Sequence, residues 1–228
     1  LKQIKIQPSN AVITQKFVDK IFAKYFGSTL NLNELQDRIN VIKKWYEDQG
    51  YSIARVAGPE RISDNGSIQL NIDEGIVSEI QIRFIGADEK VRKGKTKEWV
   101  IRRELKTNSG DVFNRKILEN DIKRLYATSL FNDINVSLKP DSQNSKKVII
   151  ALDISEQRTG SLTGGIGFSN SAGVFAQLGL KESNAFGRAW SSDMNLNFGD
   201  YSTTFNFSLL DPWIKGDKYR TAFKTNIF

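Results

Sequence analysis

The chain has 228 residues, no cysteine, no histidine and a formal net charge of +7. This length allows one large domain or two to three small ones. Without Cys there is no disulfide framework or thiolate site, and without His the Ser-His and Cys-His pairs and the commonest metal ligands are absent. From Gly160 onward six Lys and Arg oppose five Asp and Glu, so most of the positive charge belongs to the first 159 residues. A solvated surface explains such a modest excess.

No run of 18 apolar residues occurs, so the sequence predicts no transmembrane helix. Leu1 begins inside a strand-like run and Phe228 ends inside another. We therefore expect the chain to be a piece of a longer protein.

Residues 1–75 predict one β-α-α-β-β unit. A short strand carries Ile4 and Ile6, and two helical stretches follow, each with apolar side chains along one face. These side chains are Phe17, Ile21 and Tyr25 in the first helix and Leu35, Ile39, Ile42 and Tyr46 in the second, which follows a cap region at Asn31. Strands at residues 52–56 and 67–72 complete the unit through a turn at Asp64-Asn65-Gly66.

Residues 76–157 repeat this pattern. Five apolar positions recur 80 residues later in the same order: Ile42, Tyr46, Tyr51, Ala54 and Val56 return as Ile122, Tyr126, Phe131, Ile134 and Val136. A strand at residues 80–84 and a pair of strands at 132–138 and 147–154 flank two helical stretches. The sequence therefore predicts two copies of one α+β unit.

After Gly160, five runs alternate apolar with small or polar side chains. They begin near residues 161, 173, 190, 201 and 219, and each gives a strand one apolar and one polar face. Strands of roughly ten residues suit a tilted membrane span, and Trp190, Tyr201, Trp213 and Tyr219 lie near the predicted strand ends, as in aromatic girdles. A soluble sheet with one buried face has the same alternation, so periodicity leaves both interpretations open.

Several motifs together resemble a known family. The segment Tyr46-Glu-Asp-Gln-Gly50-Tyr51, followed by residues 66–75 ending in Asp-Glu-Gly, resembles the signature of POTRA (polypeptide-transport-associated) domains. The second copy departs from it with Leu130 in place of the glycine and Glu156-Gln157 in place of Glu-Gly. Two such units before barrel strands resemble BamA-type outer-membrane assembly factors, whose superfamily includes chloroplast outer-envelope translocation channels and two-partner secretion transporters. The segments 184–187 (Asn-Ala-Phe-Gly) and 211–213 (Asp-Pro-Trp) resemble the barrel start of that group.

The resemblance implies an α+β fold with POTRA domains at residues 1–75 and 76–157 and the first strands of an incomplete transmembrane β-barrel at 158–228. It implies insertion of β-barrel proteins into the outer membrane, without enzymatic chemistry and without a cofactor. The implied partners are unfolded outer-membrane β-barrel polypeptides, periplasmic chaperones or accessory assembly subunits, and outer-membrane lipid, but no nucleic acid. The implied location is the outer membrane, with the POTRA domains in the periplasm, or the chloroplast outer envelope.

By the same resemblance, the second strand of each POTRA unit would bind a client by adding the client's strand to an open edge. These edges comprise Ser52, Ile53, Ala54, Arg55 and Val56, and Asn132, Asp133, Ile134, Asn135 and Val136. A purely structural edge is an equally open interpretation.

The first barrel strand would line a lateral gate, comprising Leu162, Gly164, Gly165, Ile166, Gly167 and Phe168. Its glycines either weaken pairing at a gate or relieve crowding in a curved sheet. A hinge into the barrel would comprise Glu156, Gln157, Arg158, Thr159 and Gly160. We expect the strands after Gly160 to be poorly ordered or non-natively paired, because their barrel partners are absent.

Loop 89–97 carries Lys90, Arg92, Lys93, Lys95 and Lys97. A solvated loop is the simpler interpretation, and contact with a client, a lipid head group or the barrel mouth is the functional one. For the whole chain, a secretion or import channel of the same superfamily and a soluble peptide-binding scaffold are the alternatives. An enzyme is disfavoured because no nucleophile-base pair or phosphate loop is present.

Overall fold

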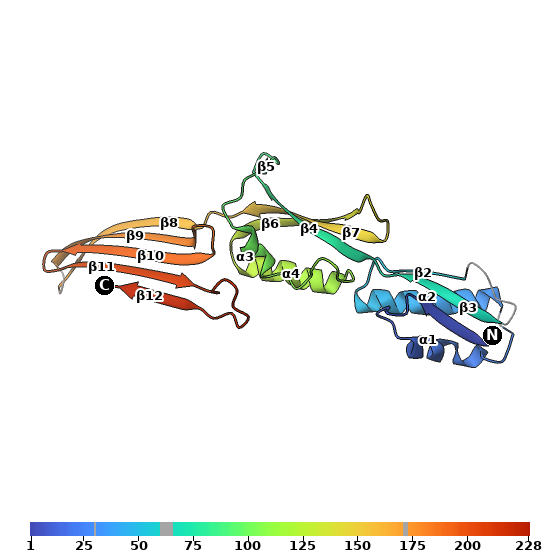
Figure 1. Cartoon of the computed structure of the whole chain (residues 1–228). Coiled ribbons are helices and arrows are strands. Elements are labelled where there is room, and N and C mark those ends of the chain that lie inside the picture. Colours follow the sequence, from blue (N-terminus) through green and yellow to red (C-terminus); the bar gives the residue numbers. More distant parts are fainter. Residues whose placement is uncertain (30, 60–65, 171–172) are drawn as a thin grey trace. The chain divides into compact units, whose positions relative to one another are not determined.

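The structure, a computed structural model, describes residues 1–29, 31–59, 66–170 and 173–228. The first repeat contains β1 (Gln3–Gln7), α1 (Gln15–Phe22), the 3-10 turn η1 (Ala23–Tyr25), α2 (Leu32–Gln49), β2 (Arg55–Ala57) and β3 (Ser67–Asp73). The strand order is β1-β3-β2, with β1 parallel and β2 antiparallel to β3 (Figure 1). The predicted β-α-α-β-β unit is confirmed, while the predicted turn at Asp64-Asn65 lies outside the described residues.

The core of this repeat forms where the helices cover the sheet. The predicted face of α2 is confirmed, since Leu35, Ile39, Ile42 and Tyr46 are all buried. The predicted face of α1 was displaced by one position: Val18 and Phe22 are the fully buried side chains. Phe17 lies instead at the margin of the core, with its ring 5.6 Å from that of Trp45. Phe17 and Ile21 are spaced four residues apart, as are the buried Val18 and Phe22, so helical spacing alone did not distinguish the two faces.

Local signals set the ends of α2. Asn31 and Glu34 form a capping box, in which each side chain accepts a hydrogen bond from the other residue's backbone N–H. Gly50 ends the helix with a φ of 95°, a left-handed conformation that suits glycine. The chain then turns, because Tyr51 N donates to Tyr46 O and Ala54 N donates to Tyr51 O. The predicted strand at Ser52–Val56 therefore starts too early: Ser52, Ile53 and Ala54 belong to this turn, and β2 begins at Arg55.

The Glu-Gly end of the motif stabilises the interior of the first repeat. Glu74 is buried, and its Oε1 accepts hydrogen bonds from the Tyr46 hydroxyl and from Val12 N, both at 2.6 Å. Burial, together with the hydrogen bond to Glu74, raises the pKa of Tyr46 well above its ordinary value. The tyrosine and the glutamate of the motif therefore fix the segment that precedes α1.

The second repeat contains β4 (Ile76–Ile85), β5 (Val91–Arg92), α3 (Glu98–Arg102), α4 (Arg115–Ala127), β6 (Phe131–Pro140) and β7 (Lys147–Glu156), with strand order β5-β4-β7-β6. Leu130, which replaces the motif glycine, is buried, and the left-handed residue is Ser129, one position earlier, with a φ of 56°. The turn is thus retained with a different residue in the strained position.

The C-terminal region is an antiparallel meander of five strands (Figure 1): β8 (Gly160–Ser169), β9 (Gly173–Ala185), β10 (Trp190–Gly199), β11 (Thr203–Asp211) and β12 (Phe223–Ile227). The expectation of poorly ordered or non-natively paired strands was wrong. Each strand pairs with the next one along the chain, so most backbone groups find partners without any absent strand. The fifth strand starts at Phe223 rather than near Tyr219, because residues 212–222 form a loop.

The observed registers align the alternating side chains into two faces. Leu162 is opposite Leu180, Leu180 opposite Met194, and Met194 opposite Phe207. On the other face, Lys181 is opposite Asp193, which is opposite Ser208. The sheet thus has one continuous apolar face and one polar face.

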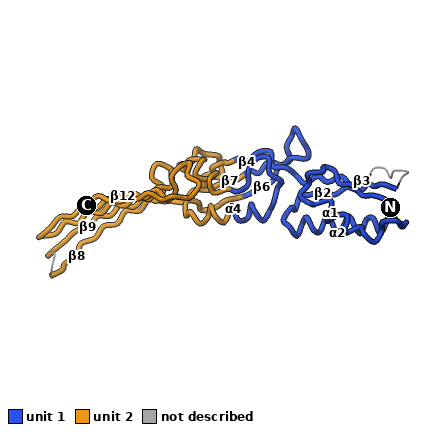
Figure 2. The backbone as a smooth tube through the Cα atoms, turned by 60° about the horizontal axis from the view of Figure 1, so that its bottom comes forward, with its two compact units in different colours: residues 1–81, 106–121, 136–151 blue, residues 82–105, 122–135, 152–228 orange. Residues whose placement is uncertain are grey.

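By compactness the chain divides into two units that cut across the second repeat (Figure 2): residues 1–81, 106–121 and 136–151, and residues 82–105, 122–135 and 152–228. The predicted boundaries at 75 and 157 stay a prediction. In the described part of the chain, no helix is long and apolar enough to cross a membrane.

Candidate functional site

Both predicted client-binding strands lie at a sheet edge. β2 pairs with β3 and ends the first sheet, and β6 ends the sheet of the second repeat. The β6 edge is partly occupied, because Ile134 N donates a hydrogen bond of 2.9 Å to the Tyr126 hydroxyl, which in turn donates to Asp133. Among the predicted residues, Asn132 and Asn135 are exposed, whereas Ile134 is buried. Client binding at either edge stays a prediction.

The predicted gate strand, β8, also ends its sheet, with β9 as its neighbour. Leu162, Ile166 and Phe168 are 76%, 88% and 72% exposed on the apolar face. At Gly167 an added Cβ would collide with the ring of Phe175, its cross-strand partner, whereas at Gly164 it would make an ordinary 3.5 Å contact with Leu178. Relief of crowding thus explains Gly167 but not Gly164.

The predicted hinge residues lie between β7 and β8, and Glu156 has a defined structural role. Its carboxylate accepts hydrogen bonds from Lys95 N at 2.8 Å, Thr96 N at 2.6 Å and Thr96 Oγ1 at 2.5 Å. Glu74 does the same in the first repeat, by binding Val12 N ahead of α1. Glu156 is therefore the second repeat's counterpart of Glu74, while the hinge motion of Gln157, Arg158, Thr159 and Gly160 stays a prediction.

The loop held by Glu156 also contacts the turn between β9 and β10. Asn184 is buried, donates from Nδ2 to Thr96 Oγ1 at 2.8 Å and accepts Ala189 N at 2.8 Å. Gly187 has a φ of 69°, its carbonyl accepts Lys97 N, and a Cβ there would overlap the Lys95 carbonyl oxygen. The motif at residues 184–187 therefore joins the second repeat to the meander.

Lys95 contributes a charged contact to the same junction. Its Nζ donates to Glu182 Oε2 at 2.8 Å and to Thr159 Oγ1 at 3.1 Å. For this residue, contact with the start of the meander is observed. Lys90 and Lys93 are exposed, as the solvated-loop interpretation expects.

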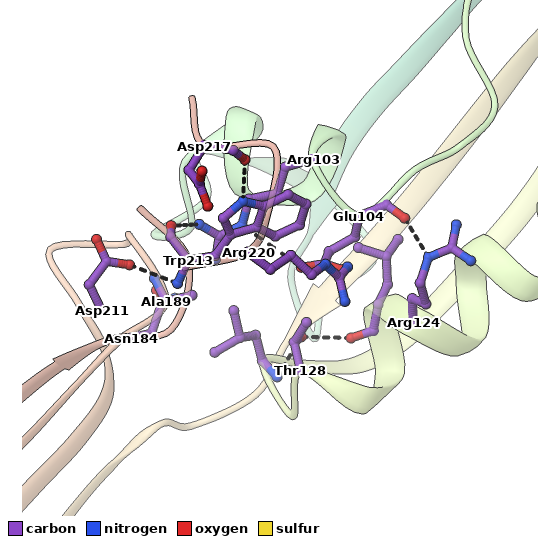
Figure 3. Close-up of polar contacts among 12 residues, drawn as sticks. Arg103, Glu104, Arg124, Thr128, Asn184, Ala189, Asp211, Trp213, Asp217 and Arg220 are labelled. Carbon is purple, nitrogen blue, oxygen red and sulfur yellow. Dashed lines mark hydrogen bonds and ion pairs between the residues drawn. The ribbon is translucent and has the colours of Figure 1, made fainter. Parts of the chain in front are cut away.

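A second junction, which we call the clamp, comprises Trp99, Arg103, Glu104, Trp213 and Arg220. Figure 3 labels the last four of these residues. The Arg103 guanidinium lies 5.0 Å from the ring centroid of Trp99 and 5.2 Å from that of Trp213, and Arg103 Nη1 donates to Trp213 O at 2.8 Å. Arg220 lies 4.4 Å from the Trp213 ring and forms a 2.5 Å ion pair with Glu104. The clamp thus fixes the loop between β11 and β12 against the end of α3.

Electrostatics make the clamp sensitive to substitution. Burial lowers the pKa of Arg103, and the nearby carboxylates of Glu104 and Asp211 offset part of that effect. A buried guanidinium needs its aromatic and carboxylate neighbours, since an unpaired buried charge is costly. Trp213 is itself fixed, because its indole N–H donates to Asp217 O at 2.7 Å.

Sequence reasoning missed the roles of Thr96, Arg103, Glu104 and Arg220. The two motifs at 184–187 and 211–213 were the available signals, since both turned out to mark junctions. Their partners were not predictable because Arg103 and Trp213 are 110 residues apart in the chain.

Comparison with protein families gives two adjoining matches. Residues 1–75 match the family described as "POTRA domain, ShlB-type", and residues 81–157 match the POTRA family described as "Surface antigen variable number repeat". Each repeat of the chain is therefore similar to a POTRA domain.

Curated relatives come from plants and bacteria. The chain is 29% identical over 220 residues to the chloroplastic outer envelope protein 80 of Arabidopsis thaliana, covering 92% of this chain and 29% of the relative. It is 27% identical over 194 residues to the outer membrane protein assembly factor BamA of Buchnera aphidicola, covering 81% of this chain and 30% of the relative. The chain thus spans less than a third of the length of these relatives.

Solved structures share the fold. The N-terminal domain of Omp85 from the cyanobacterium Thermosynechococcus elongatus is 37% identical, with a TM-score of 0.65 over 70% of this chain and 67% of that one. BamA from Haemophilus ducreyi lacking POTRA domains 1-3 is 25% identical, with a TM-score of 0.53 over 89% of this chain and 38% of that one. This second match extends beyond the POTRA repeats.

Two POTRA folds that lead into a two-faced antiparallel sheet define the class of outer-membrane proteins that carry POTRA domains ahead of a β-barrel. Within that class, the chain belongs to the Omp85 family, together with BamA and the chloroplast outer-envelope relatives.

Proposed function

We propose that this chain is the part of an outer-membrane assembly factor in which POTRA edges receive an unfolded β-barrel polypeptide and β8 templates its insertion. The observation that carries the proposal is the open outer edge of β8 beside a continuous, exposed apolar face. A strand in lipid must satisfy its backbone N–H and C=O groups by pairing, and an open edge offers those partners. No bond is made or broken in this function, and no cofactor is required.

The proposed location follows from the same face. The apolar side chains of β8 to β12 contact lipid of the outer membrane or chloroplast outer envelope, and the POTRA domains lie in the periplasm or its plastid equivalent. Accessory subunits and chaperones would deliver clients to the POTRA domains. A soluble scaffold is disfavoured because the apolar face is exposed rather than buried.

Crosslinking in the full-length parent protein tests the gate. A photoreactive residue replaces Ile166 on β8 in one variant and Leu196 on β10, inside the sheet, in the other, and both are reconstituted in liposomes with an unfolded β-barrel client. We expect client crosslinks at position 166 well above those at 196. Equal crosslinking at both positions, or none at 166, would contradict templating by β8. A client recovered in the vesicle lumen rather than the bilayer would indicate a transport channel instead.

A further inference from the structure

A groove joins the two predicted client-binding strands. It has a volume of about 300 Å³ and is lined by the start of β2 and the end of β3 from the first repeat, and by the end of β6 and the start of β7 from the second. All of these residues lie in one compact unit.

The lining of this groove includes apolar side chains from both repeats. Ile53 packs over Gly75, where an added Cβ would overlap its side chain. Leu138, at the end of β6, is 40% exposed, and Val148 lies at the start of β7. Apolar residues at alternate positions of an extended peptide could bury against these side chains while its backbone pairs with the edge of β2.

The charged side chains around the groove are mostly positive. Arg55, Lys139, Lys146 and Lys147 line it, against the single carboxylate of Asp73, whose Oδ1 accepts Gly75 N. Asp141 lies beside Lys147 and offsets part of its charge. Among the residues that the structure describes, none forms an ion pair with Arg55, Lys139 or Lys146, and all three are exposed.

We propose that this groove binds an extended polypeptide in which acidic side chains alternate with apolar ones. The inference rests on the proposed client-binding function and adds the chemical class of the segment that binds. The apolar lining provides contact area, and the cationic residues select the charge, which acts on specificity and association rate more than on total affinity.

Peptide binding to the full chain, held in nonionic detergent, tests this proposal. Three fluorescein-labelled nonapeptides alternate Val with Glu, with Gln or with Lys, and fluorescence anisotropy gives their dissociation constants. We expect the Glu peptide to bind roughly tenfold more tightly than the Lys peptide at low salt, with the difference shrinking at high salt because exposed charges are screened. The Lys139→Glu/Lys146→Glu double variant should abolish or reverse the preference. The control Lys43→Glu, exposed on α2 outside the groove, should retain it.

The outcomes separate this inference from the proposed function. Equal binding of all three peptides would retain client binding but overturn the acidic preference. If the Lys139→Glu/Lys146→Glu variant still prefers the Glu peptide, the assignment to this groove is overturned. Failure of all three peptides to bind would contradict both the groove and the client-binding role of the POTRA domains.

Discussion

At the scale of single residues, Glu74 and Glu156 show what the end of the POTRA motif does. Each carboxylate lies at the end of its repeat's last strand and binds the backbone just ahead of the first helix. The first repeat adds the Tyr46 hydroxyl, whereas Tyr126 is directed to the β6 edge instead. The two repeats thus share one anchor and use the same tyrosine differently.

Removing the Tyr46 hydroxyl should destabilise the first repeat. In Tyr46→Phe the buried Glu74 loses one of its two hydrogen bonds at Oε1, which costs about 1–3 kcal/mol of unfolding free energy. Urea unfolding, monitored by tryptophan fluorescence, measures the change, since the ring centroids of Trp45 and Tyr46 are 5.1 Å apart. Tyr25→Phe is the control because Tyr25 is only partly buried, and an equal loss there would argue against the Glu74 contact.

The same tyrosine predicts a pH dependence. The pKa of Tyr46 is raised in the folded state, so its contribution to stability is complete below the unfolded pKa of about 10 and is lost as the pH rises above it. Unfolding free energy should therefore fall more steeply above about pH 10 in the parent chain than in Tyr46→Phe. Identical slopes in urea titrations at successive alkaline pH values would contradict this prediction.

Gly187 should tolerate no side chain. Gly187→Ala would combine a positive φ with overlap of the Lys95 carbonyl, so we expect a loss of roughly 2 kcal/mol or more, with faster amide exchange at the junction. Gly216→Ala is the matched control: its φ is 86°, but no atom lies within 4 Å of the added Cβ. A loss of about 1 kcal/mol is expected there, from backbone strain alone. Equal losses would show that contact with Lys95 is unimportant.

At the scale of elements, α3 and the β11–β12 loop depend on each other through the clamp. A double-mutant cycle of Arg103→Ala and Trp213→Ala should give a coupling energy of about 1 kcal/mol, since a cation-π contact joins the two side chains. The hydrogen bond from Arg103 to the backbone carbonyl of Trp213 is retained in Trp213→Ala and adds nothing to this coupling. Arg102→Ala is the control, because its ion pair with Glu98 is solvent-exposed and should contribute about 0.3–0.5 kcal/mol. Additive losses in the cycle would mean that the two residues do not act together.

Element types were predictable from the sequence, whereas the residue pairs that form the junctions were not. Alternation at Leu162, Ile166 and Phe168 and helical spacing at Leu35, Ile39 and Ile42 each depend on neighbours in the chain, so a short window of sequence contains the signal. The start of β2 was predicted too early because the left-handed Gly50 is followed by a turn that the apolar pattern does not reveal. The clamp was not predicted because its residues come together only in the folded chain.

At the scale of the whole molecule, the two faces of the meander determine where charge is tolerated. Leu196→Arg places a charge on the apolar face, and Asn195→Arg places it one residue away on the polar face. In the full-length protein in lipid, the first should cost about 2–4 kcal/mol if it lies near the bilayer centre, and the second much less. Denaturant titration with heat-dependent gel mobility as the readout measures both. Equal tolerance of the two changes would contradict a lipid-facing apolar surface.

The order of the five strands in the meander also bears on how the protein itself folds. Because β8 to β12 each pair with their neighbours in sequence, the contacts between them span short stretches of chain. Such local topologies fold faster than those that need distant segments to meet. The sheet can therefore form strand by strand after the POTRA domains, and the outer edge of β8 stays unpaired while β9 to β12 are added.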